Sequence, residues 1–263
     1  MEQIILGAVQ GIIEWLPVSS EGILVLIKIN ILNSSQPLPE IIKQVLFLHL
    51  GTFFAALVYF RKDVINLSRS VLNFNKASKE TKSLLFFLII STIISGILGG
   101  LFLKLLEDTP INLETMGKII SGAIGVLLII TGSLQLKTKN SGKRKIKDLK
   151  TIDGVVLGIV QGLASFPGLS RSGTTVSALL FKKFDKKTAL KLSFLMSLPV
   201  VLAGNIILNG KDFTISTGNG LALFSSFIFG LATIHLLLKL AQKINFGIFV
   251  IGFGVLTILF ILV

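Results

Sequence analysis

Several residue types that carry chemistry in soluble enzymes are scarce in this chain. Its 263 residues include no cysteine, one tryptophan, one tyrosine and two histidines. The absence of cysteine excludes disulfides and thiol chemistry. Charged residues make up only 15% of the chain, whereas soluble domains carry about 25%. These shortages exclude a disulfide-bonded domain and argue against an ordinary soluble one.

Apolar residues dominate what remains. Hydrophobic types make up 52% of the chain, and several runs reach the roughly 20 residues needed to cross about 30 Å of hydrocarbon. The runs predict six full spans, at 41–60, 83–106, 115–136, 187–209, 219–238 and 245–262. The N-terminus has no basic leader, and Glu2 and Glu14 interrupt its apolar stretch, so a cleaved signal peptide is not expected. The composition therefore predicts an all-α integral membrane protein.

The charge of the chain is strongly one-sided. Lys and Arg number 26 against 13 Asp and Glu, which gives a net charge of +13. Twenty of these cations lie between the apolar runs: six in 61–82, seven in 137–150, five in 182–191, and two at Lys239 and Lys243. There they would meet water or anionic headgroups. Because the membrane explains the charge, nucleic acid is not expected as a partner.

Two stretches of the chain repeat each other at an offset of 151 residues. Residues 6–22 read LGAVQGIIEWLPVSSEG and residues 157–173 read LGIVQGLASFPGLSRSG, with seven of the 17 positions identical. Chance would give about one or two identities at ordinary composition. Each copy is apolar, breaks at Pro, Ser and Gly, and turns apolar again. Paired interrupted segments in the two halves of a membrane chain point to a binding site.

The interrupted segments, residues 2–30 and 152–181, are predicted to be re-entrant helical hairpins. The first arm of each has about 12–14 residues and reaches about 20 Å, which stops short of the far surface. Pro and Gly end the helix there, and exposed backbone at that depth is tolerated only inside protein or beside a watery cavity. The predicted fold is therefore six transmembrane helices plus two re-entrant hairpins in an inverted-topology repeat.

This arrangement predicts a single membrane domain over 1–263. Repeat one covers 1–136, a basic loop covers 137–150, and repeat two covers 151–263. Three crossings per half invert the second repeat, so the hairpins should enter from opposite surfaces and meet near the midplane. All 20 cations between spans then fall on one side, which should be cytoplasmic. The protein is expected to be multi-pass in the cell membrane, with both termini and the first hairpin on the outer face.

The hairpin breaks contain three ionisable groups, Glu14, Glu21 and Arg171, which are functional candidates by default inside a membrane. Hydroxyls surround them at Ser19, Ser20, Ser165, Ser170, Ser172, Thr174 and Thr175. The planar fork of arginine suits phosphate, and the helix that follows each break adds free N–H groups. The carboxylates would either hold a divalent cation such as Mg²⁺ or Ca²⁺, with Glu14 as a ligand, or act as general acid and base.

Each candidate also has a structural explanation. Arg171 could be an ion-pair partner of Glu14 that locks the hairpins together, because buried charges are usually paired. Glu21 could lie at the level of the headgroups on the outer side. Gln161 is interpreted as a packing contact between helices, and His49 as a core histidine with its hydrogen bonds satisfied.

Two signatures resemble those of a known family. QGIIEWLPVSS over Gln10–Ser20 resembles the first signature of the undecaprenyl-diphosphate phosphatases of the bacitracin-resistance type, and PGLSRSGTT over Pro167–Thr175 resembles the second. The resemblance covers nearly the whole chain. It implies a membrane enzyme that removes the terminal phosphate of a C55 polyprenyl diphosphate on the outer face, which recycles the lipid carrier for peptidoglycan and surface-glycan synthesis.

The resemblance also implies roles for individual residues. Glu14 matches the essential glutamate, Ser20 the serine proposed as nucleophile or phosphate ligand, and Arg171 the phosphate-binding arginine. The substrate-binding residues expected with them are Gln10, Ser19, Ser170, Ser172 and Thr175.

One position departs from the signature. The family continues Ser-Ser-Thr-Gly-His, whereas this chain reads Ser19-Ser20-Glu21-Gly22-Ile23. Without the histidine, Ser20 lacks its obvious activator. Glu21 then becomes a catalytic candidate, as a base or as a metal ligand.

The leading hypothesis is a polyprenyl-diphosphate phosphatase. Water or Ser20 would attack the terminal phosphorus, Glu14 would orient or accept the proton, and Arg171 would stabilise the transferring phosphoryl group. The alternative is a flippase or transporter of a phosphorylated polyprenyl lipid, since facing broken helices in inverted repeats are also transporter architecture. The expected partners are the polyprenyl diphosphate and the bilayer. The prenyl length and the oligomeric state are left open, a homodimer included.

Overall fold

The computed structural model describes residues 1–16, 19–32, 34–108, 142–165, 170–210, 217–240 and 246–262, with isolated positions between 122 and 136. The regular elements in these ranges are all helical, apart from one isolated bridge between Arg144 and Phe184. The α-helices are α1 (Glu2–Ile13), α2 (Ser20–Leu26), α3 (Leu38–Tyr59), α4 (Arg61–Leu72), α5 (Lys79–Asp108), α7 (Thr151–Leu163), α8 (Arg171–Phe181), α9 (Lys186–Asn209), α10 (Thr217–Leu240) and α11 (Phe246–Leu262). Shorter turns are η1 (Ile27–Ile31), η2 (Phe74–Lys76) and η3 (Ile146–Asp148). The all-α prediction is confirmed.

Four helices in the described ranges are long and apolar enough to cross a bilayer. They are α3 over Glu40–Tyr59, α5 over Lys79–Phe102, α9 over Lys186–Asn209 and α10 over Gly218–Leu237. Each corresponds to a predicted span. The predicted span 115–136 lies mostly outside the described residues, and α11, at the sixth, has 17 residues. The membrane class is confirmed, while the count of six spans and two hairpins stays a prediction.

Helix α5 carries a continuous apolar outer face. Phe86, Ile89, Ile93, Ile97 and Leu101 are each about half exposed or more, and their spacing of three or four residues places them on one side of the helix. Such a stripe on a soluble protein would mark an interaction surface or an aggregation hazard. On a helix of this length it is the surface that acyl chains cover.

The stretch 61–82 was predicted only as a basic loop, yet much of it is helical. Helix α4 follows directly after α3, and Lys191 of α9 pairs with its Asp63 at 2.7 Å. The helix carries exposed Ile65, Val71 and Leu72 together with charged residues such as Arg69. A mixture of this kind is typical of helices in the membrane interface, and a search for long apolar runs does not find it.

The two hairpins pack against helices of the opposite repeat in matching ways. Gly7 and Gly11 of α1 lie directly against α10, and an added Cβ would come within 2.1 and 2.6 Å of its backbone, respectively. Their repeat counterparts Gly158 and Gly162 of α7 lie against α5 in the same manner. The shared glycines therefore allow close helix contact, which is how helices associate in lipid.

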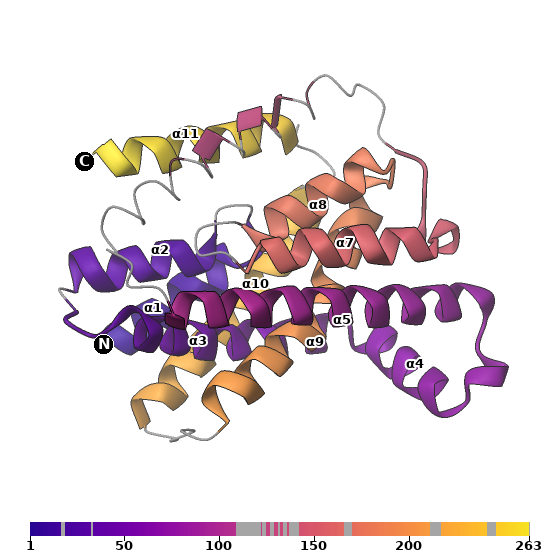
Figure 1. Ribbon diagram of the computed structural model, residues 1–263, viewed down its shortest axis with the longest axis horizontal. Coiled ribbons are helices and arrows are strands. Elements are labelled where there is room, and N and C mark those ends of the chain that lie inside the picture. The colour runs from indigo at the N-terminus through magenta and orange to yellow at the C-terminus, as the bar shows by residue number, and fades with distance from the viewer. Residues whose placement is uncertain are drawn as a thin grey trace.

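The hairpins also approach each other from opposite ends of the molecule. Figure 1 shows the first hairpin, α1 and α2, in the left half of the view and the second, α7 and α8, in the right half. Both termini lie toward the left end, and α4 lies toward the right. The hydroxyl of Ser172, in the first turn of α8, donates to the carbonyl of Leu16 at 2.7 Å. The tips are therefore in contact.

Candidate active site

The second helix of each hairpin begins with the same cap. Ser19 Oγ accepts a hydrogen bond from the Gly22 N–H at 3.3 Å, and Ser170 Oγ accepts one from the Gly173 N–H at 3.1 Å. A serine at the N-cap satisfies one of the free N–H groups of the first helical turn. This shared cap gives a physical reason for two of the identities in the sequence repeat.

The first cap is also strained. Ser19 has a φ of 57°, in the left-handed region that non-glycine residues seldom adopt. Such a conformation costs on the order of 1–3 kcal/mol and persists where the surrounding structure holds it. It directly precedes Ser20, the first residue of α2, whose hydroxyl reaches Glu14.

Glu14 is the centre of the site. It follows α1 directly and is 4% exposed. One carboxylate oxygen, Oε1, pairs with Arg171 Nη2. The other, Oε2, accepts hydrogen bonds from Gln10 Nε2 at 2.8 Å and Ser20 Oγ at 2.6 Å. The carboxylate therefore joins both hairpins through residues that are 157 positions apart in the chain.

Arg171 retains an unused donor. Its Nη1 is buried and has no hydrogen-bond partner among the described residues. A buried donor without a partner costs about 1–3 kcal/mol, so an oxygen of a ligand would be favourable at this position. The backbone here is fixed, because Thr175 Oγ1 donates to the Arg171 carbonyl at 2.6 Å and lies 2.7 Å from Ser193 Oγ of α9.

A histidine that the sequence suggested to be a core residue also reaches this cluster. His49 Nε2, from α3, lies 3.2 Å from Glu14 Oε2 and 3.5 Å from Ser20 Oγ. Its Nδ1 lies 2.8 Å from the carbonyl oxygen of Val45. His49 is satisfied and buried, as expected, but its position beside the candidate nucleophile was missed. The sequence did signal this residue, as an ionisable group inside a span and as the first residue of the stretch His49-Leu50-Gly51-Thr52, which also resembles the family.

Glu21 lies close to the same group of charges. It is in the first turn of α2, within electrostatic range of His49 and Glu14. The described residues hold no group of three or more His, Cys, Asp or Glu side chains in a metal-binding arrangement. Both oxygens of Glu14 already accept hydrogen bonds from protein donors. The donor set does not fit a resident cation on Glu14.

The remaining predicted residues have identifiable contacts. Gln161 donates to Ser95 Oγ at 3.2 Å and to the Met196 carbonyl at 3.3 Å, which agrees with a packing contact between helices. Ser172 Oγ lies 3.3 Å from Ser170 Oγ in addition to its bond across the tips. The predicted break residues 17–18 and 166–169 lie outside the described residues.

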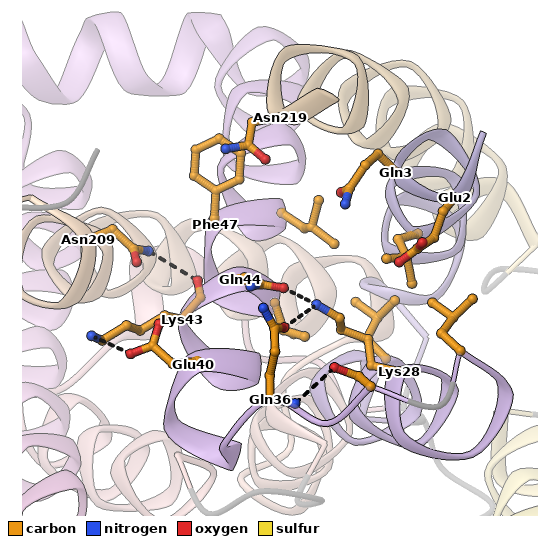
Figure 2. A pocket seen from close by; sticks show the side chains of 16 residues that line it. Glu2, Gln3, Lys28, Gln36, Glu40, Lys43, Gln44, Phe47, Asn209 and Asn219 are labelled. Carbon is orange, nitrogen blue, oxygen red and sulfur yellow. Dashed lines mark hydrogen bonds and ion pairs between the residues drawn. The ribbon is translucent and has the colours of Figure 1, made fainter. Parts of the chain in front are cut away.

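A polar pocket lies at the end of the molecule that holds the N-terminus. Its volume is about 560 Å³. Figure 2 shows Lys28 in the pocket, where its ammonium donates to the side-chain carbonyls of Gln44 and Gln36. The inner lining includes Leu6, Leu24, Val45 and Leu48. Val45, in this lining, also contacts His49 of the Glu14 cluster through its backbone carbonyl.

Known proteins resemble this chain over almost its full length. A family model described as "Bacitracin resistance protein BacA" matches residues 3–259. An undecaprenyl-diphosphatase of Methanococcoides burtonii is 42% identical, with 98% of this chain and 97% of the relative covered. Proteins of the same name from Methanothrix thermoacetophila and Alkaliphilus metalliredigens are 36% and 32% identical, each over 98% of this chain and 95% and 97% of the relative.

Proposed function

Because the chain belongs to the bacitracin resistance protein BacA family, we propose that it hydrolyses a polyprenyl diphosphate of the undecaprenyl type. The products are the polyprenyl monophosphate and inorganic phosphate. The protein is thus a membrane phosphatase that cleaves a phosphoanhydride bond. Release of the monophosphate returns the lipid carrier to the synthesis of cell-envelope glycans.

The observation that carries this proposal is the contact between Glu14 and Arg171 at the hairpin tips. The Nη1 donor of Arg171, buried and without a partner among the described residues, can receive an oxygen of the terminal phosphate. The Ser20 hydroxyl lies on the opposite side of Glu14, 2.6 Å from Oε2. A phosphate beside Glu14 that reaches both groups would meet a positive donor and a nucleophile.

The proposed chemistry begins with attack by Ser20 Oγ on the terminal phosphorus. The new bond joins Oγ to phosphorus, and the bond from phosphorus to the bridging oxygen breaks, so the monophosphate leaves as an anion. Water then attacks the phosphoserine and releases inorganic phosphate. Arg171 stabilises the charge on the equatorial oxygens in both steps. Trapping of a phosphoserine at Ser20 supports this order, whereas turnover by a Ser20→Ala variant would indicate direct attack by water.

The lipid substrate and the released phosphate would use different routes. The prenyl tail lies in lipid beside exposed apolar faces such as that of α5. The phosphate leaves through the pocket around Lys28, at the end of the molecule opposite α4. Since α4 and the basic loops would face the cytoplasm, the pocket would open on the outer face.

Divalent-ion dependence and assembly remain predictions. Glu14 is a poor candidate for a resident Mg²⁺ or Ca²⁺ because Arg171, Gln10 and Ser20 occupy its oxygens. A cation would have to arrive with the diphosphate, and Glu21, within electrostatic range of Glu14, is a carboxylate that could meet it. Activity that survives chelation would rule this out. A homodimer is tested by the mass of the purified protein in detergent.

The decisive experiment measures phosphate release by purified protein from C55 and shorter prenyl diphosphates, with and without a chelator. Release that is lost in a Glu14→Gln/Arg171→Ala double variant supports the function and the site. Full activity in that variant would overturn the site. Headgroup transfer across liposomes without phosphate release would instead indicate a flippase.

A further inference from the structure

We propose that His49 of α3 is the general base of this reaction and replaces the histidine that the sequence lacks at position 23. The inference rests on the proposed hydrolysis and adds a catalytic residue to it. The two ring nitrogens of His49 face different groups, and this difference assigns a role to each.

The first nitrogen fixes the tautomer. Nδ1 lies 2.8 Å from the carbonyl oxygen of Val45, one turn earlier in the same helix. A carbonyl can only accept, so Nδ1 must carry a proton. In the neutral ring the other nitrogen, Nε2, is then an acceptor with a free lone pair.

That lone pair lies beside the nucleophile. Nε2, Ser20 Oγ and Glu14 Oε2 form a triangle with sides of 2.6 Å between Ser20 and Glu14, 3.2 Å between His49 and Glu14, and 3.5 Å between His49 and Ser20. When the ring is neutral, the Ser20 hydroxyl is the proton donor of this triangle, and in the structure it donates to Glu14 Oε2. For attack, the hydroxyl turns toward Nε2, 3.5 Å away, and passes its proton to His49, and the imidazolium that forms is paired with Glu14.

This transfer completes a balanced cycle. Ser20 Oγ loses its proton to Nε2 as it bonds to the terminal phosphorus, and the monophosphate leaves with the electrons of the broken bond. Water hydrolyses the phosphoserine, and Nε2 returns its proton to Ser20 Oγ as inorganic phosphate departs. As in other enzymes with an activated serine, a histidine takes the serine proton, but here the Val45 carbonyl holds Nδ1 and Glu14 contacts Nε2.

The surroundings of His49 suit a group that gains and loses a proton. Glu14 from α1 contacts it, Glu21 from α2 lies within electrostatic range, and Arg171 from α8 balances Glu14 on the opposite oxygen. With His49 protonated, the set would contain two carboxylates, Glu14 and Glu21, and two cations, His49 and Arg171. His235, the other histidine, instead has an exposed contact with Tyr59 at 3.3 Å.

The test compares His49→Gln with His235→Gln in phosphate release. A glutamine keeps hydrogen-bonding capacity at position 49 but cannot take a proton. We expect kcat to fall about 10²–10⁴-fold with little change in KM, and the acid limb of the kcat–pH profile to disappear. His235→Gln should match the unsubstituted protein. A His49→Gln variant with an unchanged kcat and acid limb would overturn the role of His49.

A second measurement does not depend on the folding of the His49 variant. His235→Gln leaves one histidine, whose ¹⁵N resonances can be followed against pH. Titration of Nε2 over the same pH range as the acid limb of kcat supports the proposal, and a ring that does not titrate there contradicts it. If the unsubstituted protein releases no phosphate at all, it is the proposed hydrolysis that fails.

Discussion

Arg171 of the second hairpin contacts Glu14 of the first. A substitution can separate the planar hydrogen-bonding geometry of this arginine from its positive charge. Arg171→Lys keeps the positive charge but removes the planar fork with its second donor. Loss of one such donor to a transition state costs about 10²–10³-fold in rate. We therefore expect a fall of this size in kcat/KM for phosphate release, with Arg69→Lys on the exposed face of α4 as the control.

The same variant tests whether the ion pair between Arg171 and Glu14 has a catalytic role or only a structural one. A lysine at 171 can still pair with Glu14, so an arginine that only locks the hairpins would be replaced with little loss of activity. Thermal unfolding of Arg171→Lys should remain within a few degrees of the unsubstituted protein. A large loss of stability that accounts for the whole loss of activity would favour the structural explanation.

The site residues differ in how well the sequence announces them. Glu14 and Arg171 stand out because a charge beside a broken membrane helix is expensive and needs a partner. His49 does not stand out, since it lies in an unbroken apolar helix and its neighbours in space are 29 and 35 residues away. Which face of α3 meets the hairpin is decided by tertiary packing, which no local pattern records.

At the scale of helices, the contact of α1 with α10 depends on the absence of a side chain. A Cβ at Gly11 would approach the Gly230 nitrogen to 2.6 Å. We expect Gly11→Val to destabilise the protein by about 1–3 kcal/mol or more, because the backbone cannot move aside cheaply. The measurement is the thermal midpoint in detergent.

Helix α5 offers the matched control for this substitution. Gly100 has nothing within 4 Å of an added Cβ, so Gly100→Val should leave the midpoint nearly unchanged. Equal effects of the two valines would mean that helix propensity, rather than helix contact, sets the loss.

The segment between the repeats is held by a second charge cluster. Arg144 Nη2 lies 2.5 Å from Asp153 Oδ2 at the start of α7 and donates to the Asp148 carbonyl at 2.7 Å. Lys182, after α8, pairs with the same carboxylate at 3.1 Å. Asp153 is almost fully buried, so this cluster ties both arms of the second hairpin to the segment 142–150.

Removal of the guanidinium should loosen that segment. We expect Arg144→Gln to cost about 1–3 kcal/mol, since the buried carboxylate loses its best donors. Limited proteolysis within 142–150 should then become faster. Lys147→Gln, an exposed neighbour, is the control, and equal cleavage of the two variants would contradict the clamp.

The helices themselves follow from hydropathy to different degrees. Long apolar runs predicted α3, α5, α9 and α10, because about 20 apolar residues are needed to cross lipid. The hairpin arms were predicted from Pro, Gly and the repeat. Helix α4 was not, since its apolar residues are interspersed with Arg and Lys and its position depends on contacts such as that of Asp63 with Lys191.

At the scale of the whole molecule, the basic segments and the pocket lie toward opposite ends of the long axis. The helix α4 and the basic segment before α7 lie toward one end, whereas the N-terminus, the C-terminus and the pocket lie toward the other. The positive-inside rule predicts that the first end faces the cytoplasm. Phosphate would then be released outside, and this orientation can be tested without knowledge of the substrate.

The absence of cysteine makes the test clean, because one introduced thiol is the only thiol in the chain. Ser35, beside the pocket residues Ser34 and Gln36, and Asn75, in η2 after α4, are both exposed. A membrane-impermeant maleimide applied to intact cells should label Ser35→Cys and should not label Asn75→Cys until the membrane is opened. Both variants should label equally after lysis. The reverse pattern would place the pocket in the cytoplasm, and hydrolysis on the outer face would then be wrong even if the chemistry at Glu14 and Arg171 were right.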